Sequence, residues 1–139
     1  MSIETLIEDF SFLDDWEERY RYVIELGKDL DPLSAEEHSA ANKVQGCVSQ
    51  VWLVSEANGA RLVFRGDSDA FIVRGLIAIL LRIYSGRTAT EILAIDAREI
   101  FERLGLNEHL SPQRSNGLYS MVERVKAHAN TQLAHEPRL

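Results

Sequence analysis

The stretch from Asp69 to Tyr84 constrains the fold of this chain more than any other segment. Its side chains are apolar almost all the way round a helix, and a helix of that kind belongs in the middle of a core. Ser68 is placed to cap its N-terminus, and Ser85-Gly86 is placed to end it. We therefore expect one domain built around residues 69–84.

A β-hairpin is predicted just before this helix. Residues 48–54 and 62–64 are two short runs rich in β-branched and aromatic side chains. Asn58-Gly59 lies between them and is a favoured pair for a tight turn whose two central positions need positive φ. Two strands alone are marginal in water, so the hairpin must pack on helices, and a short third strand is expected before Gly46.

The remaining segments carry helical signals. Apolar residues recur at helical spacing in residues 3–10 and from Trp16 onward, with Asp14 or Asp15 as the cap of the second helix. Ser34 with Glu37 has the spacing of a capping box and predicts a short helix there. The other helix signals are the pairs Thr88 with Glu91 and Asp96 with Glu99, and Ser111-Pro112 before the apolar stripe of Leu118, Met121, Val122, Val125 and Ala129.

These elements predict a single α+β domain over residues 1–139, with helices packed around a small antiparallel sheet. The core is expected to span residues 3–130. The polar tail, residues 131–139, is expected to fray.

Charge and cysteine content narrow the function. The chain of 139 residues has a formal charge of -7, from 15 basic and 22 acidic residues, and no cluster of five basic residues. A general nucleic-acid binder is therefore not expected. The longest apolar run, residues 75–81, is far short of the roughly 20 residues that cross a bilayer. Met1-Ser2-Ile3-Glu4 lacks the basic region of an export signal, and one cysteine excludes an internal disulfide, so we expect a cytoplasmic protein.

Cys47 is the candidate for chemistry. It lies between the N-terminal helices and the hairpin, directly after Gly46, which lets another molecule approach the thiol closely. A loop thiol beside backbone N–H groups can act as a nucleophile if its pKa falls or a partner supplies a base. The alternative is that a lone cysteine among valines is a small buried hydrophobe.

Other candidate residues are less informative by pattern alone. Asp67 and Asp69 read first as acids at a helix start, where negative charge is favoured. Arg114 reads as a surface charge unless it folds back toward Cys47. Metal binding is not expected, because the four histidines show no pair at ligand spacing; they are His38, His109, His128 and His135.

Four ordered blocks together are more specific than any single motif. They are Asp15–Tyr20 with Glu25–Gly27, Val44–Cys47 with Ser49–Trp52, Gly66–Ala70 with Gly75-Leu76, and Arg114–Leu118. From about Trp16 to Val122 the chain resembles the SufE family, the sulfur acceptors that serve cysteine desulfurases in iron–sulfur cluster assembly. It departs from the family at Val48, where a polar residue is common, and at Asp31, which separates leucine from proline.

The resemblance implies transpersulfidation on Cys47. A pyridoxal-phosphate cysteine desulfurase would hold sulfur as a persulfide, and Cys47 would accept that sulfur and pass it to a cluster scaffold. The protein would then be a sulfur carrier and activator with no cofactor of its own, since the pyridoxal belongs to the partner. The loop and partner-binding residues that the resemblance implies are Gln45, Gly46, Ser49, Asp69 and Arg114.

Several alternatives stay open at this point. The chain could be an iron–sulfur scaffold, although one cysteine supplies too few thiolates, an interaction module with a structural Cys47, or a thiol redox sensor, although no resolving cysteine exists. The SufE or CsdE branch, a homodimer, and the choice of Lys43 or Arg114 as activator of the thiol also stay open. Val48 and Val51 suggest that the thiol turns toward the core between transfers, with Gly46 as the pivot.

Overall fold

The computed structural model describes residues 3–47 and 49–135, and its centre is the apolar helix α3, Phe71–Tyr84. Ten of its fourteen residues are buried, as the sequence predicts. The helix begins two residues later than expected: its N-cap is Ala70, and Ser68 is the last residue of a strand. Ser68 still accepts a hydrogen bond from the Ala70 backbone N–H, but strand pairing holds its own backbone extended.

The helix α2, Trp16–Lys28, packs against α3 at two facing glycines. A Cβ added to Gly75 would lie 2.1 Å from the backbone oxygen of Val23, and one added to Gly27 would lie 2.6 Å from the Gly75 nitrogen. The two backbones therefore approach more closely than any side chain allows. The predicted cap of α2 is present, since Asp15 accepts from the backbone N–H of Glu18.

The sheet has the order β1-β2-β3 and is antiparallel. The hairpin of β1, Val51–Asn58, and β2, Arg61–Ser68, is confirmed, but its turn is shifted by one residue. Asn58 pairs with Arg61, so the two central residues are Gly59 and Ala60, and only Gly59 has positive φ (62°). This is the pattern of a turn with glycine at its first central position.

The third strand is not where the sequence predicted it. The strand β3, Arg87–Thr88, pairs with the far end of β2. Before Gly46 the chain makes a single antiparallel bridge, Lys43 with Trp52. The neighbouring backbone hydrogen bonds, from Val44 N–H to Val51 O (2.8 Å) and from Leu53 N–H to residue 42, hold this segment beside β1 without making it a strand.

The capping box at Ser34 forms without a helix. Ser34 and Glu37 exchange both expected hydrogen bonds, but residues 35–37 form only a turn, because the Glu37 and His38 side chains bind β2. The capping box at Thr88 and Glu91 does start a helix.

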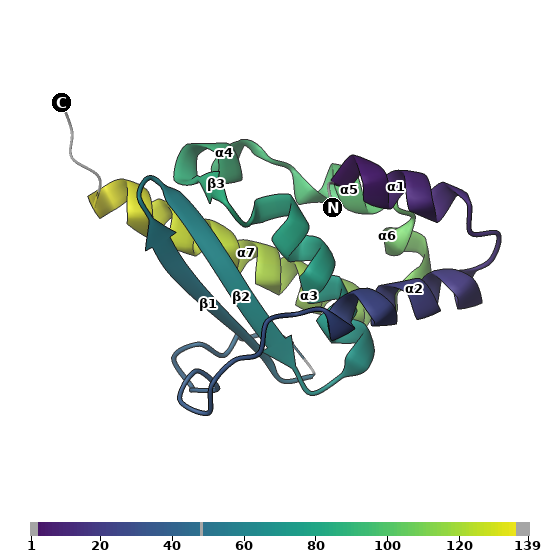
Figure 1. Cartoon of the computed structure of the whole chain (residues 1–139), viewed down its shortest axis with the longest axis horizontal. Coiled ribbons are helices and arrows are strands. Elements are labelled where there is room, and N and C mark those ends of the chain that lie inside the picture. Colours follow the sequence, from purple (N-terminus) through teal and green to yellow (C-terminus); the bar gives the residue numbers. More distant parts are fainter. Residues whose placement is uncertain (1–2, 48, 136–139) are drawn as a thin grey trace.

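The hairpin lies along one side of the molecule, with α3 and the long helix α7, Pro112–His135, next to it (Figure 1). The helix α7 presents its predicted apolar stripe to the core, and the described part of the expected tail, residues 131–135, is helical rather than frayed. Residues 136–139 lie outside the described part. These findings confirm the α+β class. The other helices are α1, Ile3–Ser11; α4, Ala89–Ala94; α5, Ala97–Arg103; and α6, Leu106–His109.

Candidate functional site

Cys47 lies where the connection from α2 turns into β1. Gly46 before it has a φ of 87°, in the left-handed region that favours glycine. A Cβ at Gly46 would lie 2.6 Å from the Ser120 Oγ on α7. The glycine expected as a pivot is therefore required both by its backbone angle and by the close approach of α7.

The thiol faces inward and is about half-buried, as expected beside Val51. Its Sγ lies 3.5 Å from the backbone oxygen of Gly117 on α7, and a Cβ on Gly117 would contact that sulfur. Burial raises the pKa of the Cys47 thiol, because the charged form loses solvation. Val48, the other valine cited for this orientation, lies outside the described residues.

The sulfur borders a cavity of about 110 Å³. The connection, β1, α3 and α7 all contribute to its wall, so the site exists only in the folded chain. Ser49, which the resemblance implies as a loop and partner-binding residue, is part of this wall. The lining residues are Cys47, Ser49, Val51, Val73, Leu76, Ser111, Gln113, Arg114, Gly117 and Met121.

Arg114 folds back to this cavity instead of extending from the surface. It lies in the first turn of α7, whose start is marked by a hydrogen bond from its backbone N–H to Ser111 Oγ. Its Nη1 is buried and has no hydrogen-bond partner among the described residues. A buried guanidinium donor with no partner is rare in folded proteins, and a small shift of the Arg114 side chain would bring it to an anionic group in the cavity. Lys43, the other candidate activator, is not part of the cavity wall that the structure describes.

Asp69 ties the base of the hairpin to the cysteine-bearing loop. Its carboxylate accepts from the Gln50 backbone N–H (3.1 Å), and its own N–H donates to the Gln50 oxygen (3.3 Å). Asp69 and Gln45 are both exposed. Asp69 therefore holds the loop through Gln50, in addition to lying just before α3, where its pattern suggested an acid at a helix start.

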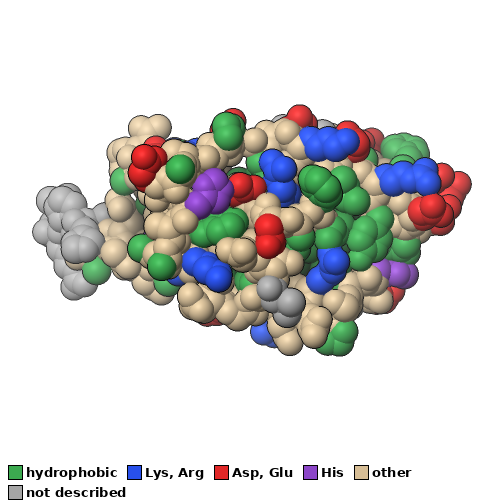
Figure 2. Space-filling model, turned by 90° about the horizontal axis from the view of Figure 1, so that it is seen from below, with side chains coloured by type: hydrophobic (Ala, Val, Ile, Leu, Met, Phe, Trp, Pro, Cys, Tyr) green, Lys and Arg blue, Asp and Glu red, His purple; other side chains and the backbone are tan. Residues whose placement is uncertain are grey.

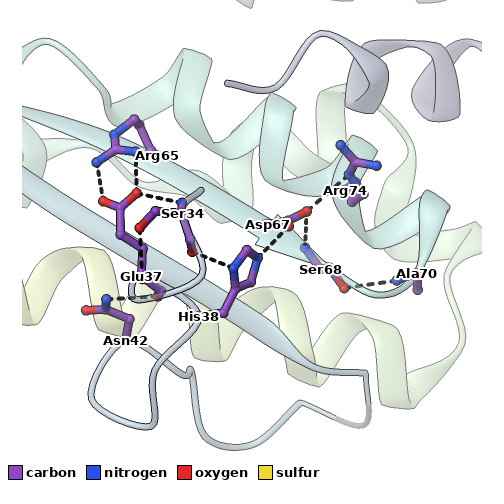
Figure 3. Close-up of polar contacts among 9 residues, drawn as sticks. All are labelled: Ser34, Glu37, His38, Asn42, Arg65, Asp67, Ser68, Ala70 and Arg74. Atoms are coloured by element: carbon purple, nitrogen blue, oxygen red, sulfur yellow. Dashed lines mark hydrogen bonds and ion pairs between the residues drawn. The ribbon is translucent and has the colours of Figure 1, made fainter. Parts of the chain in front are cut away.

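A polar network on the outer face of the sheet holds the earlier part of the connection (Figure 3). Arg65 of β2 forms an ion pair with Glu37, and this hydrogen bond is the main reason that the pKa of Glu37 falls to about 2. His38 Nε2 lies 2.8 Å from Asp67, whose other oxygen lies 3.2 Å from Arg74 Nε. The hydrogen bond to Asp67 raises the pKa of His38 above its ordinary value.

Sequence reasoning missed the contacts of two α7 residues: Arg124 donates to backbone oxygens of the connection, and His128 contacts Arg124 and Ser55 of β1. Their signal was available: Gly117, Met121, Arg124 and His128 recur at spacings of three to four residues, which places them on one helix face. That face shares Met121 with the apolar stripe, and its Arg124 binds the connection.

Two kinds of feature are absent from the residues that the structure describes. In residues 3–47 and 49–135, no three or more His, Cys, Asp or Glu side chains are grouped closely enough to hold a metal ion. The helices of the described chain include none that is long and apolar enough to span a bilayer.

Comparisons with known proteins agree with one another. A family model described as the SufE Fe-S metabolism associated domain matches residues 4–129. An uncharacterized SufE-like protein of Rhizobium meliloti is 56% identical over 136 residues, which covers 95% of this chain and 97% of that protein. One from Rhizobium etli is 57% identical over 137 residues, covering 96% and 93%.

A solved structure shares the fold. It is the solution structure of a hypothetical protein from Thermus thermophilus, with a TM-score of 0.77 over 96% of this chain and 99% of that one. At 19% identity the likeness concerns the fold alone.

Proposed function

The chain belongs to the SufE family of Fe–S metabolism proteins, and from that premise we propose that it accepts sulfur on Cys47 from a cysteine desulfurase. The observation that carries the proposal is the position of the thiol: Cys47 Sγ borders a cavity whose wall also includes Arg114, with its unpartnered Nη1. A cysteine that only fills space in a core is surrounded by packed apolar side chains, whereas Cys47 borders a cavity that a cationic side chain also lines.

The transfer is a thiol–disulfide type exchange. The Cys47 thiolate attacks the outer sulfur of a persulfide on the desulfurase cysteine. A sulfur–sulfur bond forms on Cys47 while the bond between the two partner sulfurs breaks, and the partner cysteine leaves as a thiolate. The persulfide on Cys47 is then anionic once deprotonated, and Arg114 is the cation of the cavity wall suited to hold it.

The protein is in this proposal a sulfur carrier and activator in the cytoplasm, with pyridoxal phosphate confined to the desulfurase and a cluster scaffold as the next acceptor. We propose that Gln45, Gly46, Ser49, Asp69 and Arg114 contact the desulfurase; of these, Ser49 and Arg114 line the cavity and Gln45 and Asp69 are exposed. The space-filling view suits a protein partner, because hydrophobic side chains gather in its right half, bordered by separate Lys and Arg side chains (Figure 2).

The scaffold alternative is less well supported. A cluster needs several protein ligands, and this chain has one cysteine. A redox sensor is disfavoured for a related reason, since no second cysteine exists to resolve an oxidised Cys47.

The test is Cys47→Ser in an assay of sulfide and alanine release by a cysteine desulfurase supplied with cysteine. Serine is nearly isosteric but cannot carry a persulfide, so we expect complete loss of stimulation with an unchanged circular dichroism spectrum. Intact-mass analysis of the wild-type protein should show the addition of one sulfur atom. The control is Thr90→Ser, an exposed residue of α4. A folded Cys47→Ser protein that still stimulates the desulfurase would remove Cys47 from the mechanism.

A further inference from the structure

Arg124 of α7 joins three parts of the molecule through one guanidinium. Its Nη1 donates to the backbone oxygen of Lys43 (3.3 Å), and its Nη2 donates to the backbone oxygen of Ala41. Its Nε lies 3.4 Å from Nε2 of His128, whose Nδ1 lies 3.0 Å from the Ser55 hydroxyl on β1. The segment that leads to Cys47 is therefore hydrogen-bonded to α7 by its main chain.

This geometry specifies the protonation state of His128. An arginine side chain can only donate, so Nε2 of His128 must accept from Arg124. The single ring proton is then on Nδ1 and is donated to Ser55. A proton added to Nε2 would put two donors face to face and would remove the hydrogen bond.

The contact lies close to the reactive thiol. Lys43 is four residues before Cys47, and it is also the residue that bridges to Trp52 of β1. The same helix supplies the Gly117 oxygen next to the sulfur. The helix α7 thus holds the connection at two points, one before the cysteine and one at the thiol itself.

We propose that Arg124 is a positioning residue for Cys47, kept in place by neutral His128, and that protonation of His128 releases the connection so that the thiol becomes more exposed. The proposal deepens the sulfur-acceptor function above and rests on it for its purpose. The physical claim about Cys47 exposure stands separately from that function.

The surroundings of His128 keep it neutral at neutral pH. Burial and, secondarily, the positive charge of Arg124 lower the pKa of His128 below its ordinary value. The elements packed against the ring contribute the hydroxyl of Ser55 from β1 and the ring of Phe64 from β2, whose centroid is 6.2 Å away. Release is therefore expected only in acid.

The first experiment measures the rate at which iodoacetamide alkylates Cys47 in the full chain at neutral pH. Removing a charged hydrogen-bonding group that holds a loop changes its opening equilibrium by about tenfold or more, so Arg124→Ala should react about tenfold faster than wild type. Lys126→Ala is the matched control: it removes a cation from the same helix that lines a different cavity, and it should react at the wild-type rate. If Arg124→Ala does not fold, Arg124→Lys keeps the charge but not the fork and serves the same test.

The second experiment is a pH profile with a dipyridyl disulfide, a thiol reagent that stays active in acid. After correction for thiol ionisation, the rate at which the reagent modifies wild-type Cys47 should rise as the pH falls below the ordinary pKa of histidine. His128→Gln keeps an acceptor for Arg124 and a donor for Ser55 but cannot titrate, so its corrected profile should be flat. The melting temperature of His128→Gln at neutral pH should equal that of wild type. If His128 had only a structural role, its replacement would lower the melting temperature.

The outcomes are decisive for the proposal. A folded Arg124→Ala protein with the wild-type alkylation rate, or a His128→Gln profile that follows wild type, would overturn it. If wild-type Cys47 accepts no sulfur from any desulfurase while the alkylation results hold, the proposed function fails and the positioning role of Arg124 remains.

Discussion

The helix α3 and the connection from α2 to β1 (residues 29–50) are held in the molecule by different forces. In α3 ten residues are buried, including Leu76 and Ile77 in the core between α2 and the sheet. In the described part of the connection only Leu33 and Val44 are buried. Polar contacts with β2 and α7 hold it instead.

The difference separates stability from function. Apolar burial is insensitive to pH and costs several kcal/mol to disturb, so α3 fixes the fold and one wall of the cavity. Hydrogen bonds and partly exposed ion pairs contribute about 1 kcal/mol each. A segment held in this way can move as a unit, and in this protein it carries the thiol that must meet a partner.

The largest expected effect lies in α3. Ile77 is completely buried, so Ile77→Ala should lower the free energy of unfolding by about 3 kcal/mol through lost burial and the cavity left behind. Urea denaturation measures this. The control is Val63→Ala, at a residue of β2 that is 36% exposed, with an expected cost of about 0.5 kcal/mol. An equal loss of unfolding free energy for the two substitutions would contradict the comparison. It would show that Ile77 of α3 contributes no more to stability than a residue on the outer face of the sheet.

An intermediate effect is expected at Gly46. An alanine there is strained at positive φ by about 1–2 kcal/mol, and its Cβ also meets the Ser120 hydroxyl. Gly86→Ala is the matched control, with a φ of 82° and open space around its Cβ. We expect both variants to be destabilised in urea, Gly46→Ala more than Gly86→Ala because of the added Ser120 contact, and we expect faster Cys47 alkylation for Gly46→Ala alone.

The Ser120 contact can be separated from the backbone strain. Ser120→Ala in the Gly46→Ala background should restore part of the slow alkylation without removing the strain. Equal alkylation rates in Gly86→Ala and Gly46→Ala would show that α7 does not limit the position of the cysteine loop.

The smallest expected effect is the pH dependence from His38. Since Asp67 raises its pKa in the folded state, the stability that His38 contributes is fully present below the ordinary pKa of 6.5 and is lost as the pH rises through the raised value. Melting temperatures from about pH 5.5 to about pH 8.5 should show this loss in wild type and not in His38→Gln. Asp67→Asn should also remove it, and persistence of the loss in both variants would assign it to another group.

His38 and His128 oppose each other in acid. Protonation strengthens the ion pair of His38 on the outer face of the sheet and removes the hydrogen bond of His128 to Arg124 on α7. Acid should therefore loosen only the half of the connection nearest Cys47, whereas heat or urea loosens both.

The sequence alone determined the features that depend on neighbours along the chain. The apolar helix, expected over residues 69–84 and observed over 71–84, the capping box at Thr88 and the stripe on α7 all follow from helical spacing or from pairs three residues apart. The same signals indicated a cap at Asp14 or Asp15, and the structure shows that the cap is Asp15. Cys47 after Gly46 was recognised as the candidate for chemistry for the same reason. Two predictions of short-range structure were wrong: the hairpin turn lies one residue later than expected, and residues 35–37 form a turn instead of a helix. In the second case the Glu37 and His38 side chains bind β2, which lies 28 and 29 residues away along the chain.

Only the tertiary structure decided what surrounds the thiol. Gly117 lies 70 residues from Cys47 along the chain, and Arg124 lies 81 residues from Lys43. Such contacts depend on how α7 packs against the hairpin and α3, and a pattern within one segment carries no information about that packing. Arg114, which the sequence pattern suggested as a surface charge, is turned toward the cavity by the fold, and its Nη1 is buried there. Arg124, which the sequence did not single out, is turned toward the connection in the same way.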